Sequence, residues 1–187
     1  MIKRELYMSR IRPFIGTELI KVMTGIHRCG KSVMLELIKQ ELTESGVSPT
    51  QFISINFEDM SYSHLQTAQA LHDEITARAA KIEGKVYLFF DEIQEVKDWE
   101  KCINSFRVSL DCDIYITGSN AKLLSGELAT YLGGRYVEFV IYPFSFGEFM
   151  ELYRSIAPDA SIQQCFQKYL LAGGMPYLAN LRYADAP

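Results

Sequence analysis

The apolar positions of the chain alternate between two spacings along its first three quarters. Five short runs, rich in β-branched and aromatic residues, occupy residues 19–24, 51–56, 86–90, 114–117 and 136–141. Such runs are typical of β-strands. Residues 86–90 are apolar at every position, which indicates a central strand that is covered on both faces. We therefore expect a five-stranded, mainly parallel sheet.

Segments with helical spacing lie between these runs. Apolar residues recur at three- or four-residue intervals in residues 32–44, 64–82 and 99–110, and Asp98 stands where the third helix needs an N-cap. A further helix is expected around residues 122–132. Strands that alternate with crossover helices form a sheet with helices on both faces. The predicted fold class is α/β, a three-layer sandwich that binds ligands at the carboxyl ends of its strands.

The last quarter of the chain has a purely helical pattern. Two pairs of residues there have the spacing of a capping box, which marks the start of a helix; they are Ser145 with Glu148 and Ser161 with Gln164. We expect residues 1–142 to form the core domain and residues 143–187 to form a small helical, lid-like appendage.

A glycine-containing loop connects the first predicted strand to the first predicted helix. Its Gly-x-x-x-x-Gly-Lys-Ser spacing, in this context, is that of a Walker A phosphate loop. The two glycines let successive N–H groups point inward at the positive end of the helix, which creates a site for an anion. The predicted nucleotide-binding residues are Gly25, Ile26, His27, Arg28, Cys29, Gly30, Lys31, Ser32 and Val33.

The last residues of this loop have separate chemical tasks. Lys31 would place a positive charge beside the β- and γ-phosphates, and the Ser32 hydroxyl is an oxygen ligand of the kind that Mg²⁺ prefers. We expect His27 to face solvent and Cys29 to fill a small space. A chance glycine-rich turn is the alternative, which the flanking strand and helix disfavour. The loop therefore predicts that the chain binds ATP with Mg²⁺.

Two carboxylates follow the predicted central strand. Asp91 at the strand end could hold Mg²⁺ through a bound water, while Glu92 could orient or deprotonate the attacking water. Alone, such a pair is more often a solvated loop. Because it follows a matching phosphate loop by about sixty residues, we favour the catalytic interpretation, the Walker B arrangement, with Glu92 as general base.

Asn120 and Arg135 are further candidates for catalysis. Asn120 follows the fourth predicted strand, where a γ-phosphate or lytic water would lie, although it could equally cap the next helix. Arg135 stands just before the fifth strand. Its guanidinium could stabilise transition-state charge, and a surface salt bridge is the alternative.

Several strings taken together resemble a prokaryotic AAA-type ATPase family, over most of residues 10–180. The specific strings are Phe90-Asp91-Glu92-Ile93-Gln94 and Thr117-Gly118-Ser119-Asn120-Ala121; the phosphate loop, Asn56-Phe57-Glu58-Asp59, Gly134-Arg135 and Pro143-Phe144-Ser145-Phe146 accompany them.

This resemblance implies roles for three residues. Asn120 would be a sensor-1 residue, Arg135 an arginine finger, and Asn56 a switch that holds Glu92 away from water until a partner binds. Members of the family usually continue into a C-terminal domain of unknown function, so we expect this chain to be truncated. A protein or DNA partner would then act through the missing region, and Arg135 would act between protomers only in a homo-oligomer.

Charge and composition limit the expected cellular location of the protein and the classes of partner that it could bind. A net charge of -4 and a pI near 5.4 give no overall cationic field that would draw the protein onto nucleic acid. The N-terminal cluster of Lys3, Arg4, Arg10 and Arg12 is the candidate for a local basic patch, although such a cluster is more often an ordinary solvated face. We find no signal peptide, membrane span or paired cysteine spacing, so we expect a cytoplasmic, reduced protein without membrane contact.

Two classes of function stay open. The first is an ATPase that couples hydrolysis to movement of the appendage. The alternative is a nucleotide-gated binding module that presents a surface to protein or DNA with little hydrolysis. A small-molecule kinase is disfavoured because we see no arginine-rich lid, and a GTPase is disfavoured because the Asn-Lys-x-Asp string is absent.

Overall fold

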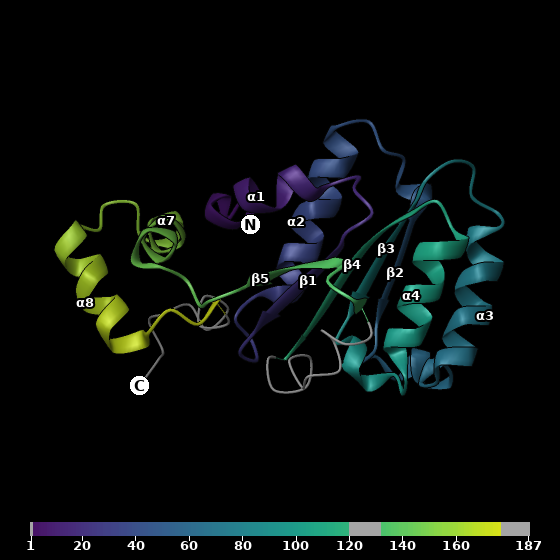
Figure 1. The fold of residues 1–187 in the computed structure, drawn as a ribbon. Coiled ribbons are helices and arrows are strands. Elements are labelled where there is room, and N and C mark those ends of the chain that lie inside the picture. Colours follow the sequence, from purple (N-terminus) through teal and green to yellow (C-terminus); the bar gives the residue numbers. More distant parts are fainter. Residues whose placement is uncertain (1, 120–131, 177–187) are drawn as a thin grey trace.

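The computed structural model describes residues 2–119 and 132–176 of the chain, and its centre is a five-stranded sheet (Figure 1). The strand order is β2-β3-β4-β1-β5, and every neighbouring pair is parallel. The strands are β1 (Ile20–Gly25), β2 (Phe52–Asn56), β3 (Val86–Asp91), β4 (Cys112–Ser119) and β5 (Tyr136–Val140). The predicted α/β class and the five strands are confirmed.

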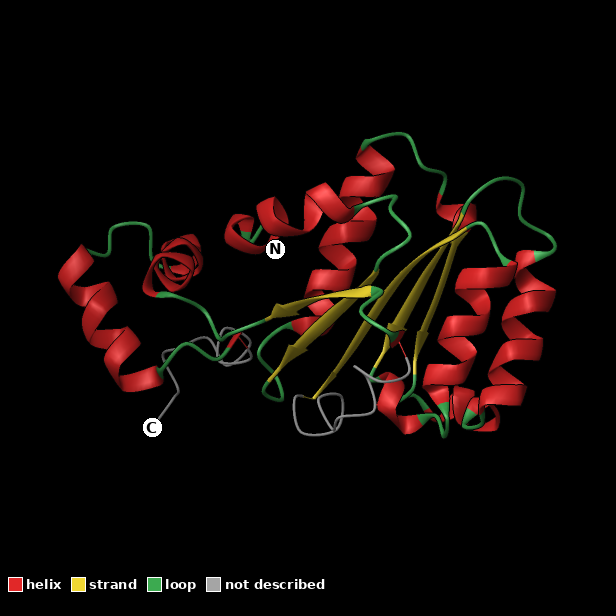
Figure 2. Ribbon diagram, viewed as in Figure 1, coloured by secondary structure: helices red, strands yellow, loops and turns green. Residues whose placement is uncertain are grey.

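Helices cover both faces of this sheet and make it the middle of three layers (Figure 2). On one face lie α1 (Glu5–Ile11) and α2 (Lys31–Glu44), and on the other lie α3 (Ala68–Ala79) and α4 (Trp99–Ser109). Successive side chains of β3 point to opposite faces, so Leu88 and Phe90 pack with α3 and α4, whereas Phe89 packs with α1 and α2. This double burial explains the uninterrupted apolar run of the central strand.

Two details of the predicted helices are wrong. The helix expected over residues 64–82 is divided, because Thr67 accepts a hydrogen bond from the Ala70 amide and α3 begins only at Ala68, after a short 3-10 helix at Met60–Leu65. Asp98 precedes α4 without capping it through its side chain, because that carboxylate accepts a hydrogen bond from Lys101 Nζ instead. The helix expected over residues 122–132 lies almost wholly outside the described residues.

The last two helices, α7 (Phe146–Ile156) and α8 (Ile162–Ala172), form a separate pair beyond β5 (Figure 1). Both predicted capping boxes are present. Phe144 and Phe149 form the small apolar cluster of this pair, and Ile2 packs against it from the other end of the chain. The N-terminal segment therefore contacts the α7–α8 pair as well as the sheet.

The described helices are short. The longest, α2, has 14 residues. Within residues 2–119 and 132–176, no helix combines the length and the apolar composition that crossing a bilayer would require.

Candidate functional site

The Gly25–Ser32 loop leaves the carboxyl end of β1 and enters α2. A Cβ atom on Gly25 would clash with the carbonyl oxygen of Ile141 and with Cys29 Sγ. Gly30 has a φ of 102°, a left-handed conformation that side chains disfavour. Both glycines of the motif are therefore required by the local geometry, one for close packing and one for the turn into the helix.

The loop has an exposed tip and a buried base. Ile26, His27 and Arg28 are exposed, whereas Cys29 is fully buried and its burial raises the pKa of the thiol. This agrees with a solvent-facing His27 and with Cys29 as a filler. Ser32 is exposed in the first turn of α2, where its hydroxyl is accessible from solvent.

Lys31 lies in the buried part of the site. Its Nζ is 3.4 Å from the Gly25 carbonyl oxygen, 3.5 Å from that of Ile26 and 3.3 Å from Glu92 Oε1. These contacts are all at the long end of hydrogen-bond distances. The structure thus brings the lysine of the phosphate loop against the carboxylate that follows β3.

The neighbouring strand β4 fixes the acidic pair. Thr117 Oγ1 donates a hydrogen bond to Asp91 Oδ1 and accepts one from the Glu92 amide at 3.0 Å. Asp91 and Glu92 are 6% and 8% exposed, so most of their surface is shielded from bulk water. Thr117 belongs to the Thr117–Ala121 string of the sequence, but only the pairing of β3 with β4 shows that it orients the Asp91 carboxylate and fixes the Glu92 backbone.

Both oxygens of the Glu92 carboxylate have contacts. Gln94 Nε2 donates a 2.5 Å hydrogen bond to Oε2, while Oε1 faces Lys31. Glu92 itself has a φ of 54°, and the following 3-10 helix, Ile93–Glu95, turns Gln94 back toward it. In the sequence, Gln94 belongs to the Phe90–Gln94 string, and its position two residues after Glu92 is the signal that indicates this contact.

Asn56 and Arg135 lie at the ends of other strands. Asn56 ends β2 in register with Asp91, and its Oδ1 accepts a hydrogen bond from the Glu58 amide at 2.9 Å. The Arg135 carbonyl accepts from the Ile20 amide at the amino-terminal end of β1. The whole six-residue strand, about 20 Å long, therefore separates Arg135 from the loop of its own chain. Asn120 lies outside the described residues.

Arg4 is part of this region, although the sequence suggested a solvated face. It is only 2% exposed. Its guanidinium donates to the Cys29 carbonyl at 3.0 Å, to the Tyr142 carbonyl at 2.7 Å and to Glu148 Oε1 at 2.9 Å. The prediction for the basic cluster is wrong for this residue, because its partners lie far away in the sequence.

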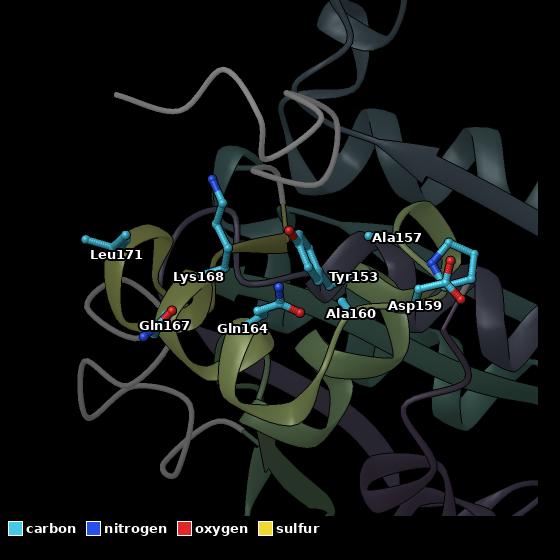
Figure 3. Close-up of a pocket in the computed structure, with 9 residues that line it drawn as sticks. Tyr153, Ala157, Asp159, Ala160, Gln164, Gln167, Lys168 and Leu171 are labelled. Carbon is cyan, nitrogen blue, oxygen red and sulfur yellow. The ribbon is translucent and has the colours of Figure 1, made fainter.

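A groove of about 550 Å³ lies in the helical pair (Figure 3). Residues of α7, of α8 and of the connection between them form its walls, among them Tyr153, Asp159, Gln164 and Lys168. Of the described residues that line it, none belongs to the predicted site. The groove thus belongs to the α7–α8 pair.

The residues at the carboxyl ends of β1 and β3 suit a metal-bound phosphate. The loop amides at the start of α2 offer the positive end of a helix to an anion. The accessible Ser32 hydroxyl and the Asp91 carboxylate are hard oxygen donors, which Mg²⁺ prefers. This donor set therefore fits a nucleotide with Mg²⁺.

Two curated relatives match the sequence. An "Uncharacterized protein" of Haemophilus influenzae is 41% identical over 187 residues, which are 100% of this chain and 46% of that protein. "Uncharacterized protein MJ1544" of Methanocaldococcus jannaschii is 33% identical over 165 residues, 84% of this chain and 35% of that one. The chain thus spans less than half the length of either relative.

Solved structures share the fold at low sequence identity. AMPPCP-bound DnaA of Aquifex aeolicus has a TM-score of 0.64 at 12% identity, covering 97% of this chain and 59% of that one. The Thermotoga maritima RuvB Holliday junction branch migration motor has a TM-score of 0.57 at 16% identity, covering 96% of this chain and 57% of that one.

The sequence profile of the AAA domain matches residues 17–150. The chain therefore belongs to the AAA domain family of P-loop proteins.

Proposed function

We propose that this chain binds ATP with Mg²⁺ at the Gly25–Ser32 loop and hydrolyses it to ADP and phosphate. The observation that carries this proposal is the 3.3 Å contact between Lys31 Nζ and Glu92 Oε1. It joins the phosphate-binding loop to a carboxylate that could serve as a base, at the carboxyl edge of the sheet where α/β folds bind ligands.

Each residue of the loop and of the acidic pair then has a task. The loop amides and Lys31 bind the phosphates, and Ser32 and Asp91 would hold the metal, Asp91 through water. Bound Mg²⁺ would neutralise phosphate charge. Glu92 accepts the proton of the attacking water. Lys31 must leave Glu92 when it turns to the phosphates, so ligand binding also frees one oxygen of the base.

Gln94 would restrain the other oxygen of that base. Its hydrogen bond to Glu92 Oε2 has the effect that the resemblance assigned to Asn56, namely to keep the carboxylate from water. Asn56 stays a proposed switch residue, since it ends the strand beside Asp91. We propose that Gln94 contributes to the same control.

Arg135 and Asn120 would complete the site in different ways. Because Arg135 stands at the opposite end of β1 from the loop, its proposed role as an arginine finger requires a second copy of the chain. Asn120 remains proposed as a sensor of the γ-phosphate. A homo-oligomer is therefore part of the proposal. A cytoplasmic location is proposed as well.

The alternative is a nucleotide-gated module with little hydrolysis. The engaged Glu92 carboxylate favours it, because a base held on both oxygens is inactive until it is released. In this case the 143–187 appendage, or a region beyond it, would present a surface to a protein or DNA partner. RuvB, one of the structural neighbours, is described as a Holliday junction branch migration motor.

A comparison of Glu92→Gln with the parent chain tests the proposal. We expect phosphate release to fall by about 10²- to 10⁴-fold, the usual contribution of a general base, while Mg-ATP still binds. Glu95→Gln, in the same turn, is the control and should hydrolyse at the parent rate. Equal rates for Glu92→Gln and the parent would exclude Glu92 as base. Binding by the parent without any phosphate release would favour the gated module.

A further inference from the structure

Arg4 is a buried cation that the proposed chemistry does not use. It lies at the start of α1, in a left-handed conformation with a φ of 46°. The rings of Tyr7 and Phe144 lie 4.6 and 5.2 Å from its guanidinium carbon. A charge that is 2% exposed is costly unless its donors are paired. The hydrogen-bond acceptors around Arg4 therefore identify the segments that stabilise its buried charge.

One side of the guanidinium holds the phosphate loop. Arg4 Nη1 donates to the Cys29 carbonyl at 3.0 Å and would lie 3.3 Å from a Cβ placed on Gly30. The carbonyl and the N–H of one trans peptide point in opposite directions. By fixing the Cys29 carbonyl, Arg4 also fixes the direction of the Gly30 N–H within the loop.

The other side holds the helical pair. Arg4 Nε donates to Glu148 Oε1 at 2.9 Å, and Glu148 also completes the capping box of α7 by accepting from the Ser145 amide at 2.8 Å. Burial alone would raise the pKa of Glu148, but the hydrogen bonds from Arg4 and Ser145 lower it below its ordinary value. The charged pair is thus intact near neutral pH. The first turn of α7 is held through this carboxylate.

The segment after α8 returns to the same place. The Phe144 amide donates to the Gly174 carbonyl at 2.6 Å, and Pro176 Cγ would lie 3.7 Å from a Cβ on Gly30. Figure 1 shows this segment running from α8 back toward the core. Both ends of the helical pair therefore meet the phosphate loop around Arg4.

We propose that Arg4 is a positioning residue that fixes the phosphate loop and couples its occupancy to α7 and α8 through Glu148. This inference rests on the proposed binding of ATP. It adds the contacts through which ATP binding would change the α7–α8 pair. When phosphates reorganise the loop, the Cys29 carbonyl moves relative to the guanidinium. The restraint on Glu148, and with it the first turn of α7, then changes.

The test combines affinity with amide hydrogen exchange on the full chain. We expect Arg4→Gln to weaken Mg-ATP binding about tenfold in calorimetry, because it removes the charged hydrogen bond to the Cys29 carbonyl of the loop. Glu148→Gln keeps the loop contact and should bind within about threefold of the parent. In the parent, Mg-ATP should alter exchange in residues 146–172, and in Glu148→Gln that response should be lost. Arg78→Gln, which breaks a pair with Glu74 on α3, is the matched control and should behave as the parent.

Each of these measurements tests the coupling between the phosphate loop and the α7–α8 pair. Parent affinity in Arg4→Gln, or an unchanged exchange response in Glu148→Gln, would overturn the coupling while leaving the proposed function in place. An absent response in the parent would overturn it too. If Arg4→Gln does not fold, Glu148→Gln alone decides. Failure of the parent to bind Mg-ATP would remove the proposed function and this inference together.

Discussion

Two buried lysines, at opposite ends of β1, face carboxylates in different ways. Lys21 Nζ contacts Asp113, donates to the Leu19 carbonyl at 2.9 Å and to that of Thr17 at 3.2 Å, and is fully buried. Among the described residues, Lys31 has contacts of only 3.3 to 3.5 Å, and it is buried next to the exposed loop tip. The first cation has its hydrogen-bond partners inside the fold, whereas the second can exchange loose contacts for a ligand.

The surroundings of the two carboxylates reinforce this difference. Asp113 also accepts from the Gly16 amide at 2.7 Å and from the Tyr115 hydroxyl at 2.8 Å, so the whole cluster is closed. Burial lowers the pKa of Lys21, and Asp113 opposes this shift. Burial of a lysine alone therefore does not mark a functional site; the number and length of its hydrogen bonds separate the two cases.

The largest effect on folding stability is expected from Lys21→Met. This change leaves Asp113 buried without its cation, which typically costs about 3–5 kcal/mol of unfolding free energy. Urea denaturation measures the loss, with Lys101→Met in the exposed pair with Asp98 as a control that should change by less than about 1 kcal/mol. A loss as small as that of the control would mean that the Lys21 cluster is not closed.

Lys31→Met is expected to have a smaller effect, on the free energy of Mg-ATP binding rather than on that of unfolding. Loss of charged contacts to phosphate corresponds to about 1.5–3 kcal/mol, or ten- to a hundred-fold weaker Mg-ATP binding. Calorimetry measures the affinity, and urea denaturation of the same variant should show less than half of the Lys21→Met loss. Should Lys31→Met bind ATP as the parent does, the comparison between the two lysines would fail.

The smallest effect is expected from Gln94→Ala. Removing one hydrogen bond, worth about 0.5–1.5 kcal/mol, should free the Glu92 carboxylate and raise phosphate release by two- to tenfold. Gln69→Ala removes a similar bond to Asp73 on the surface of α3 and serves as the control. Slower hydrolysis in Gln94→Ala would show that Gln94 supports the base rather than restrains it.

The sequence by itself determined those features that depend on neighbouring residues. The spacing of Gly25, Gly30 and Lys31, the apolar run that precedes Asp91, and the capping box of Ser145 are local patterns, because turn geometry, strand burial and helix capping act over a few residues. These patterns predicted the fold class and the strand boundaries to within two residues. They also predicted that Lys31 lies at the same edge of the sheet as Asp91 and Glu92.

Only the tertiary structure decided how each charge is paired. Arg4 and Glu148 are separated by 144 residues, and Lys21 and Asp113 by 92, so no local pattern distinguishes these cations from exposed ones. The strand order also placed Arg135 at the opposite end of β1 from the loop. The desolvation of a charge and the partners that offset it depend on which distant segments pack together, and for that reason the roles of Arg4 and Lys21 emerge only from the fold.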